Sequence, residues 1–330
     1  MRPFVYTQPK NPQEALSAAS ANEAAKYLGG GTNLIDLMKE DVERPTELIE
    51  VADLRFRDIK TNGNGGYTLG AMSNNADTAN HPDIRQHYPL LSMAMLSAAT
   101  AQIRNMATNG GNLLQRTRCP YFFETSMPCN KREPGTGCGA KDGMNALHAI
   151  FGWSEQCVAV NPSDMSVALA ALGANVQVQS PDGKARTIKF TDFHRLPGDQ
   201  PEKDNTLMPH ELITAIELPR PIFSDHYYYL KIRERSSYAF AIISVAAGLQ
   251  LQNGTIVRAG LAMGGVAHKP WKLTKAEDFL RGKKPTPENF AQAATLAMQD
   301  ARPLSDNDYK VEMGKKAIVR ALAQAYEKKA

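Results

Sequence analysis

All four cysteines of the 330-residue chain fall in one stretch of sequence. They are Cys119, Cys129, Cys138 and Cys157. The residues between them are rich in proline, glycine, asparagine and charge, which predicts a long loop, although the aromatic run at 121–123 argues against disorder. Such a loop buries too little apolar surface to offset a backbone ordering cost of about 1–2 kcal/mol per residue. We therefore expect the thiols to help fold it.

Three products suit four thiols on such a loop: a pair of disulfides, a structural zinc site or a [4Fe-4S] cluster. Zinc sites usually contain a short C-x2-4-C pair, and this chain has none. Iron–sulfur clusters also often use a compact run, so the spacing disfavours zinc without establishing iron. Disulfides need an oxidising compartment, and Met1–Tyr6 does not begin a signal peptide because no apolar segment follows. The spacing leaves these alternatives, and plain thiols, open.

Length and charge restrict the class of protein. A chain of 330 residues can form two or three domains, and its net charge of +4 is small, with both signs interspersed. No nucleic-acid-binding stripe is present, and the longest apolar run, 240–249, is too short to span a membrane. No catalytic Ser/His/Asp or Cys/His motif, paired-carboxylate motif or H-E-x-x-H motif is present, so hydrolytic chemistry has no support.

Two glycine-containing loops are candidates for binding an anion. In the first, a predicted strand at 25–28 leads through Gly29, Gly30 and Gly31 to a predicted helix at 34–38. Residues without Cβ can turn their N–H groups toward one concavity. The pattern is neither G-x-G-x-x-G nor a P-loop, so a Rossmann site or a P-loop is not predicted. The alternative is a tight turn without a ligand.

The second loop, 102–113, again places threonine, asparagine and backbone amides around a pair of glycines, Gly110 and Gly111. Two separate loops of this kind could bind one dinucleotide. Between them, the strand-like segments at 48–51 and 67–71 and the helix-like segment at 90–99 are typical of α+β structure.

These loops resemble the paired FAD-binding loops of the flavoprotein subunit of molybdenum hydroxylases, the xanthine dehydrogenase and carbon monoxide dehydrogenase family. The resemblance rests on 29–33, 103–105 and 108–112 and extends over nearly the whole chain. It implies an α+β fold: a two-part FAD-binding domain of the PCMH/VAO type, then an α+β C-terminal domain of a sheet plus helices. The implied units are 1–60, 61–222 with an iron–sulfur insertion at 115–158, and 223–330.

The resemblance also implies which residues bind FAD. Asp164 ends a family-like segment that opens a helix, Ile213 would lie against the flavin system, and Lys231 would reach the FAD. Without the resemblance, a lysine in a tyrosine-rich strand is interpreted as a surface residue. The implied cofactor-binding residues are Lys26, Tyr27, Leu28, Gly29, Gly30, Gly31, Thr32, Asn33, Leu34, Thr108, Gly110, Gly111, Asn112, Asp164, Ile213 and Lys231.

The insertion narrows the resemblance to the FAD subunit of bacterial aldehyde oxidoreductases of the PaoABC type, which carries an additional [4Fe-4S] cluster. The segments that carry this narrower resemblance are 112–122, 128–132 and 135–138. The cluster ligands that it implies are the four cysteines. Nearby charges at Arg116, Arg118, Lys131 and Arg132 would raise the cluster potential or else face solvent. His148 is interpreted as a neighbour of the ligands, a surface residue or a replacement ligand. His268 and Trp271 are interpreted as a packed connection.

By resemblance, this chain is an electron-transfer subunit. A large partner with a molybdenum cofactor would oxidise an aldehyde to a carboxylic acid, and a small partner would carry two [2Fe-2S] clusters. This chain would pass the electrons to FAD and an external acceptor, and it supplies no catalytic acid or base. The alternative is a zinc-stapled scaffold subunit without redox function. The expected location is the periplasm, by co-export with a partner that bears the signal, or the cytoplasm.

Local signals predict several other elements. Asn11 is expected to cap a helix, and 181–183 and Asn253-Gly254 are expected to turn hairpins. Three helices are predicted at 271–281, 286–301 and 308–328, the last with core or subunit-contact positions at 311, 318, 322 and 325.

Overall fold

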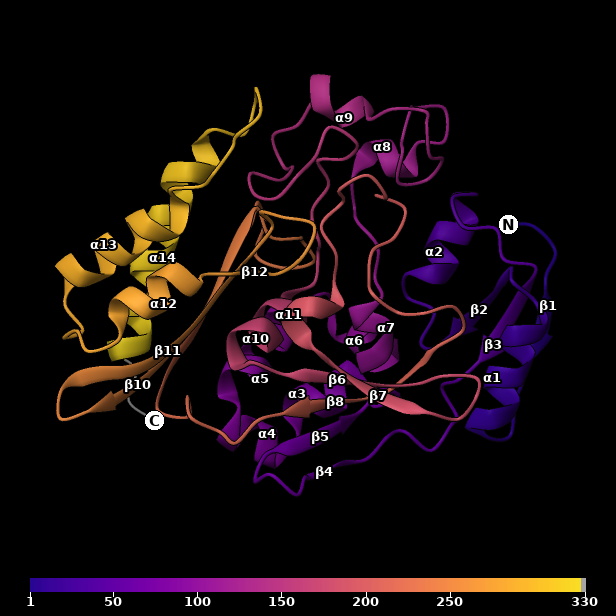
Figure 1. Cartoon of the computed structure of the whole chain (residues 1–330), viewed down its shortest axis with the longest axis horizontal. Coiled ribbons are helices and arrows are strands. Elements are labelled where there is room, and N and C mark those ends of the chain that lie inside the picture. Colours follow the sequence, from indigo (N-terminus) through magenta and orange to yellow (C-terminus); the bar gives the residue numbers. More distant parts are fainter. Residues whose placement is uncertain (328–330) are drawn as a thin grey trace.

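The computed structural model describes residues 1–327 and contains three β-sheets with helices packed against them (Figure 1). The smallest sheet is parallel and has the order β1 (Val5–Thr7), β3 (Glu47–Glu50), β2 (Ala25–Leu28). Helix α1 (Pro12–Ala21) packs on it, and the Asn11 side chain accepts a hydrogen bond from the Glu14 backbone amide at 3.0 Å. The predicted cap is therefore confirmed. After β2 the glycines turn the chain into α2 (Leu34–Lys39).

The second sheet has five antiparallel strands in the order β4-β5-β8-β6-β7. Its strands are β4 (Ile59–Thr61), β5 (Tyr67–Gly70), β8 (Leu212–Leu218), β6 (Asn175–Gln179) and β7 (Ala185–Lys189). The β6–β7 hairpin turns at 181–183, as the sequence predicted. The proposed domain boundary at residue 60 falls inside β4, and the one at 222 falls between β8 and β9. These boundaries stay predictions.

Helices surround this sheet and one of them is buried on every side. They are α3 (Asn75–Asn80), α4 (Pro82–His87), α5 (Pro89–Ser97), α6 (Ala101–Met106), α7 (Asn109–Leu113), α10 (Asp164–Leu172) and α11 (Phe190–Phe193). All residues of α10 are buried, because it packs against α5 on one side and the C-terminal sheet on the other. Ser163 caps its start, and Gly173 ends it with φ 74°, a left-handed conformation that favours glycine.

The cysteine-containing insertion lies between α7 and α10 and stands above both large sheets (Figure 1). Its only helices are the short α8 (Pro120–Phe123) and α9 (Gly139–Asp142) among the described residues. Side chains bind the backbone groups that no helix or strand satisfies here. Asn130 Oδ1 accepts hydrogen bonds from the amides of Gly135 and Gly137 at 3.0 and 2.8 Å. Arg132 donates to the carbonyls of Tyr121 and Phe122 at 2.8 and 2.9 Å.

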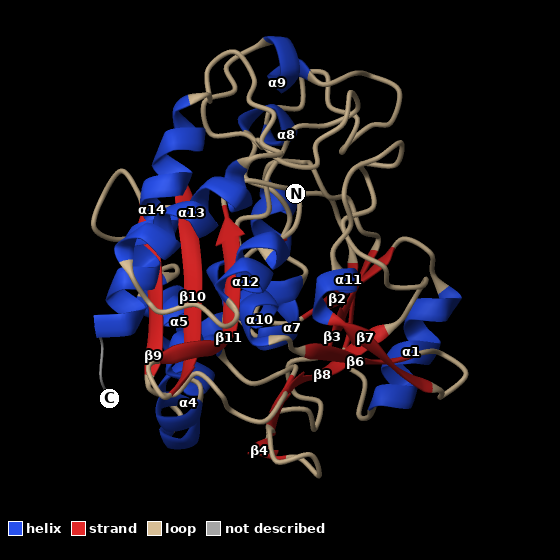
Figure 2. Ribbon diagram, turned by 60° about the vertical axis from the view of Figure 1, so that its left-hand side comes forward, coloured by secondary structure: helices blue, strands red, loops and turns tan. Residues whose placement is uncertain are grey.

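The C-terminal sheet is antiparallel, in the order β12-β11-β10-β9, and its long strands run side by side in Figure 2. They are β9 (His226–Ile232), β10 (Ile243–Gln252), β11 (Thr255–Gly264) and β12 (Trp271–Lys272), followed by α12 (Thr274–Leu280), α13 (Pro287–Met298) and α14 (Tyr309–Glu327). Asn253 and Gly254 both have positive φ, which confirms the predicted hairpin turn. The predicted end of the last helix, Lys328, lies outside the described residues.

Both faces of this sheet are covered, which explains the apolar run in β10. Ala246 packs into the core that contains α5 and α10, whereas Val245, Ala247 and Leu249 pack into a second core with α13 and α14. In α14, Ile318, Leu322 and Ala325 belong to that second core. The predicted α+β fold is confirmed. Within residues 1–327, no helix is long and apolar enough to cross a membrane.

Candidate functional site

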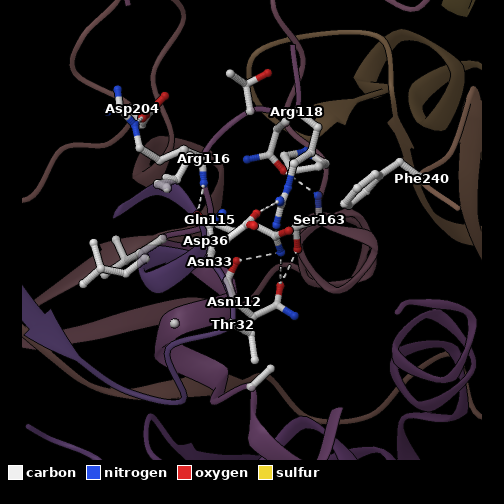
Figure 3. A pocket seen from close by; sticks show the side chains of 18 of the residues that line it. Thr32, Asn33, Asp36, Asn112, Gln115, Arg116, Arg118, Ser163, Asp204 and Phe240 are labelled. Carbon is white, nitrogen blue, oxygen red and sulfur yellow. Dashed lines mark hydrogen bonds and ion pairs between the residues drawn. The ribbon is translucent and has the colours of Figure 1, made fainter. Parts of the chain in front are cut away.

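One large cavity separates the N-terminal sheet, the insertion and the C-terminal sheet (Figure 3). Its volume is ≈ 1240 Å³, above the roughly 300–1,000 Å³ typical of pockets for drug-sized ligands. Residues 25–34 line one side, and residues of the second glycine loop, the start of the insertion and the loops at 202–211 and 234–242 line the rest. The cavity is therefore large enough for a dinucleotide, and both glycine loops reach it.

The two glycine loops touch each other directly. A Cβ on Gly30 would lie 1.7 Å from the carbonyl oxygen of Met106, and a Cβ on Gly29 would lie 2.7 Å from Thr108 Oγ1. Gly31 has φ 70° and needs glycine for its backbone conformation. These glycines are thus required by contact between the loops and by the turn, in addition to any contact with a ligand.

Asn33 presents an unused donor at the cavity. Its Oδ1 accepts a hydrogen bond from the backbone amide of Arg116 at 2.9 Å, whereas its buried Nδ2 has no hydrogen-bond partner within the described residues. Figure 3 shows Asn33 beside Thr32 and Asn112. An unpaired buried donor costs about 1–3 kcal/mol, a cost that an anionic oxygen in the cavity would remove.

The predicted residues of the second loop line the cavity, with the exception of Gly110. Thr108 accepts a hydrogen bond from the Gly111 amide at 3.1 Å and caps α7; both residues line the cavity. Asn112 also lines it and accepts a hydrogen bond from Ser163 Oγ at 2.6 Å. Gly110 does not line the cavity, because its amide donates to the carbonyl of Ala71 at 2.7 Å on the opposite side.

Asp164 and Lys231, far apart in the sequence, form a buried ion pair at the cavity. Lys231 Nζ lies 2.7 Å from Asp164 Oδ2, and each side chain is 5% exposed. Tyr229 donates to the other carboxylate oxygen at 2.7 Å, and Lys231 also donates to the carbonyl of Ser97 at 3.1 Å. Burial raises the pKa of Asp164, and the ammonium of Lys231 opposes that rise.

Ile213 lies elsewhere. It is 3% exposed in β8, paired with Val178 of β6, and it does not line the cavity. Its predicted position against the flavin system stays a prediction.

Two other residues line the cavity although the sequence did not predict them as part of the binding site. Arg118 pairs with Asp36 at 2.9 Å, and its guanidinium lies 5.1 Å from the centre of the Phe240 ring, which is half exposed. Figure 3 shows Arg118 and Phe240 side by side. Arg118 had been considered only as a charge beside the cysteines, and Phe240 reaches the cavity through the tertiary fold alone.

The alternative that the charges near the cysteines face solvent is wrong for two of them. Lys131 is 2% exposed and donates to Asp204 and to the carbonyl of Pro201, the latter at 2.7 Å. Arg116 pairs with Glu43 and with Asp204, at 2.5 and 2.8 Å. These contacts form a charge network beneath the insertion.

The four cysteines are free thiols, two buried and two half-buried, so the disulfide alternative is not realised. Cys129 and Cys138 form an antiparallel bridge through their backbones, and the thiol of Cys157 acts on that of Cys138. The neighbouring thiol of Cys157 lowers the pKa of Cys138 to about 6, whereas burial raises the pKa of Cys119 to about 12. In residues 1–327 no group of three or more His, Cys, Asp or Glu side chains is arranged to hold one metal ion.

Two histidines contact cysteine sulfur atoms. His148 Nε2 lies 3.1 Å from Cys119 Sγ, and His268 Nε2 lies 3.3 Å from Cys157 Sγ. The interpretation of His268 as only a packed connection is therefore incomplete: Trp271 does pack, stacking on Phe151 with ring centres 5.0 Å apart, but His268 reaches a thiol. The sequence could not show this contact, because 111 positions separate His268 from Cys157.

Comparison with protein families identifies the class. The chain matches the FAD binding domain in molybdopterin dehydrogenase over residues 2–221 and the CO dehydrogenase flavoprotein C-terminal domain over residues 228–328. With the two-loop cavity described above, these matches show that the chain belongs to the family of FAD-binding medium subunits of molybdenum hydroxylases. It is an oxidoreductase subunit.

Individual proteins refine the comparison. The chain is 44% identical to the aldehyde oxidoreductase FAD-binding subunit PaoB of Escherichia coli (strain K12) over 326 residues, which cover 98% of this chain and 99% of that protein. It is 27% identical to the glyceraldehyde dehydrogenase medium chain of Sulfolobus acidocaldarius over 305 residues, 92% of this chain and 90% of that protein. A solved carbon monoxide dehydrogenase from Hydrogenophaga pseudoflava shares the fold, with a TM-score of 0.78, 24% identity and coverage of 100% and 99% of the two chains.

Proposed function

We propose that this chain is the FAD and [4Fe-4S] electron-transfer subunit of a heterotrimeric, molybdenum-dependent aldehyde oxidoreductase. The observation that carries the proposal is the pairing of a dinucleotide-sized cavity with four free cysteines on an insertion that lines the same cavity through Arg118 and Cys119. The 44% identity to an aldehyde oxidoreductase FAD-binding subunit supports the choice of aldehydes as the substrate class.

FAD would occupy the cavity. The unpaired Asn33 amide, the first glycine loop and the Thr108–Gly111 turn form a cradle for the pyrophosphate, since the loops are held in contact by glycines that admit no Cβ. The Asp164–Lys231 pair and the surrounding polar residues would orient the remainder. Gly110 and Ile213 lie outside the lining, so we do not include them among the direct contacts. When bound, FAD accepts electrons singly and releases them in pairs.

The cysteines suit an iron–sulfur cluster by their chemistry. All four are free and soft thiol donors. Cys138 and burial raise the pKa of Cys157, and the ammonium of buried Lys131 opposes that rise. One zinc ion binds every thiolate at about 2.3 Å, which requires the sulfurs to share one small sphere, whereas a cluster spreads its ligands around a larger body.

The partners follow from the same proposal. Under this proposal, the oxidation of the aldehyde takes place in a large subunit with a molybdenum cofactor. A small subunit with [2Fe-2S] clusters would deliver the electrons, and this chain would pass them through FAD to an external acceptor.

Cofactor analysis of the co-purified complex tests the proposal. We expect flavin absorbance, iron and acid-labile sulfide beyond the amount that the small subunit holds, and a reduced-state EPR signal of a [4Fe-4S] cluster. The control is the variant Cys129→Ala, which should lose that signal and keep the [2Fe-2S] signals. A complex whose medium subunit contains zinc and no iron after anaerobic preparation would support the scaffold alternative instead.

A further inference from the structure

We infer that His148 and His268 donate hydrogen bonds to the sulfur atoms of Cys119 and Cys157 and thereby raise the reduction potential of the cluster. This inference rests on the proposed function, because it concerns the cluster that the four cysteines would bind. It assigns a role to two residues that are not among the proposed ligands of the cluster.

The geometry is that of two hydrogen bonds to sulfur. The Nε2–Sγ distances are 3.1 Å for His148 and 3.3 Å for His268, and the two residues are only 4% and 8% exposed. The other ring nitrogen, Nδ1, is buried without a hydrogen-bond partner in both residues, within the part of the chain that is described. The sulfur contact is thus the hydrogen bond that each ring makes.

Ligation fixes the direction of these hydrogen bonds. A cysteine sulfur bound to iron has lost its proton, so it can accept a hydrogen bond and cannot donate one. A neutral imidazole carries one proton, on either nitrogen. If Nδ1 held it, the lone pair of Nε2 would face the lone pairs of the sulfur, so the proton belongs on Nε2.

The backbone at both histidines is held by contacts that do not involve the cysteines. The carbonyl of His148 accepts hydrogen bonds from Asn307 Nδ2 at 3.2 Å and from Lys310 Nζ at 2.9 Å, both at the start of the last helix. Beside His268, the carbonyl of Ala267 accepts one from the Asn161 amide at 2.9 Å. The two donors therefore come from opposite sides: His148 from the insertion and His268 from the C-terminal sheet region.

The expected effect is a shift in potential. A reduced cluster carries one more negative charge than an oxidised one, so a donor aimed at its sulfurs stabilises the reduced form more. Removing one donor should lower the ratio of reduced to oxidised cluster about tenfold at a fixed potential. For a one-electron couple this corresponds to a fall of about 59 mV.

The experiment compares variants in the intact, co-purified complex. His148→Leu and His268→Leu remove the donor, whereas His148→Gln and His268→Gln keep an N–H at a similar position. EPR-monitored redox titration should give lower cluster potentials for the Leu variants and near-normal ones for the Gln variants, with unchanged iron content. His226→Leu, in β9 and in contact with the carbonyl of Ala325, is the control and should change nothing.

A second measurement does not depend on the variants folding. In the complex labelled with 15N-histidine, pulsed EPR of the reduced cluster should detect weak 15N coupling through the hydrogen bonds. Strong coupling, as from a nitrogen bound to iron, or no coupling at all would overturn the inference. So would Leu variants with full iron content and an unchanged potential. An unmodified complex without a [4Fe-4S] signal would instead refute the proposed function.

Discussion

At the scale of single residues, Gly30 is required to be glycine for two separate structural reasons. Glycines in an anion-binding loop are expected to bring backbone amides close to a ligand. Here the space that a Cβ of Gly30 would need is filled by the carbonyl oxygen of Met106, at 1.7 Å. The position of one loop is therefore fixed by the other, and the cradle depends on a backbone contact as well as on its donors.

Replacing Gly30 with alanine should separate the two loops. Relieving the clash requires movement of the backbone at 106–107, an overpacking that costs about 1–3 kcal/mol, and we expect the flavin content of the purified complex to fall well below one per medium subunit. The measurement is the flavin-to-protein ratio together with the melting temperature. Gly63→Ala is the control, because no atom lies within 4 Å of its added Cβ. Full flavin content in Gly30→Ala would contradict the contact described here.

At the scale of elements, the start of α14 anchors the insertion. Asn307 is fully buried, and its Nδ2 lies 3.3, 3.2 and 3.3 Å from the carbonyl oxygens of Asn145, His148 and Ala149. Lys310, also fully buried, donates to the carbonyls of His148 and Gly265. The insertion has little regular secondary structure, and side chains at and just before the start of α14 donate hydrogen bonds to its backbone carbonyls.

Asn307→Ala should loosen the insertion while the sheets stay intact. It leaves buried carbonyls without a donor, at a cost of about 1–3 kcal/mol per unsatisfied group. We expect faster hydrogen–deuterium exchange at 139–158 and unchanged exchange in β10 and β11, measured by mass spectrometry of the complex. Asn289→Ala, in α13, removes one hydrogen bond to the carbonyl of Lys284 and is the matched control. Equal exchange in the two variants would exclude an anchoring role for Asn307.

At the scale of the whole molecule, a buried charge network joins the flavin cradle to the insertion. The Arg116 amide donates to Asn33, its guanidinium pairs with Glu43 and Asp204, and Lys131 pairs with the same Asp204. Burial alone would raise the pKa of Asp204, but Lys131 and Arg116 lower it to about 2. Asp204 thus pairs with two cations that belong to the insertion, and one of them, Arg116, also pairs with Glu43.

This network predicts a dependence of stability on pH. Because the pKa of Asp204 is lower in the folded protein than its ordinary value of 3.8, its contribution is complete above about pH 4 and is lost as the pH falls toward 2. Asp204→Asn should destabilise the chain by about 3–5 kcal/mol near neutral pH, since buried Lys131 loses its carboxylate partner and Arg116 keeps only Glu43. The Asp204→Asn variant should also no longer show the part of the stability loss at low pH that the protonation of Asp204 causes.

Thermal melting of the complex from pH 7 to pH 2.5, followed by flavin release, measures both effects. Asp225→Asn, at an exposed residue outside this network, is the control and should leave the profile unchanged. A parallel profile for Asp204→Asn and the unmodified complex, offset by a constant amount, would show that Asp204 does not titrate in this range.

How far the sequence predicted the structure depended on how local each signal was. The Asn11 cap, the Asn253-Gly254 turn and the order of strand, glycines and helix at 25–39 each depend on neighbouring residues, and all were predicted. All of the predicted first-loop residues, 26–34, do line the cavity. The Asp164–Lys231 contact, the reach of Phe240 and the thiol contact of His268 depend on the packing of distant segments, which no short pattern encodes.

The two ends of the insertion lie close together, which bears on how this chain could have gained the insertion in evolution. The residues on either side of it, Asn112 and Ser163, are joined by a hydrogen bond of 2.6 Å, so the excursion leaves and re-enters the flavoprotein scaffold at nearly one point. Acquiring or discarding it would need no rearrangement of the surrounding helices, because closing so short a gap costs little chain entropy. If the insertion holds the proposed cluster, a single recombination event could convert a simple flavoprotein into one with an extra electron carrier, or reverse the change.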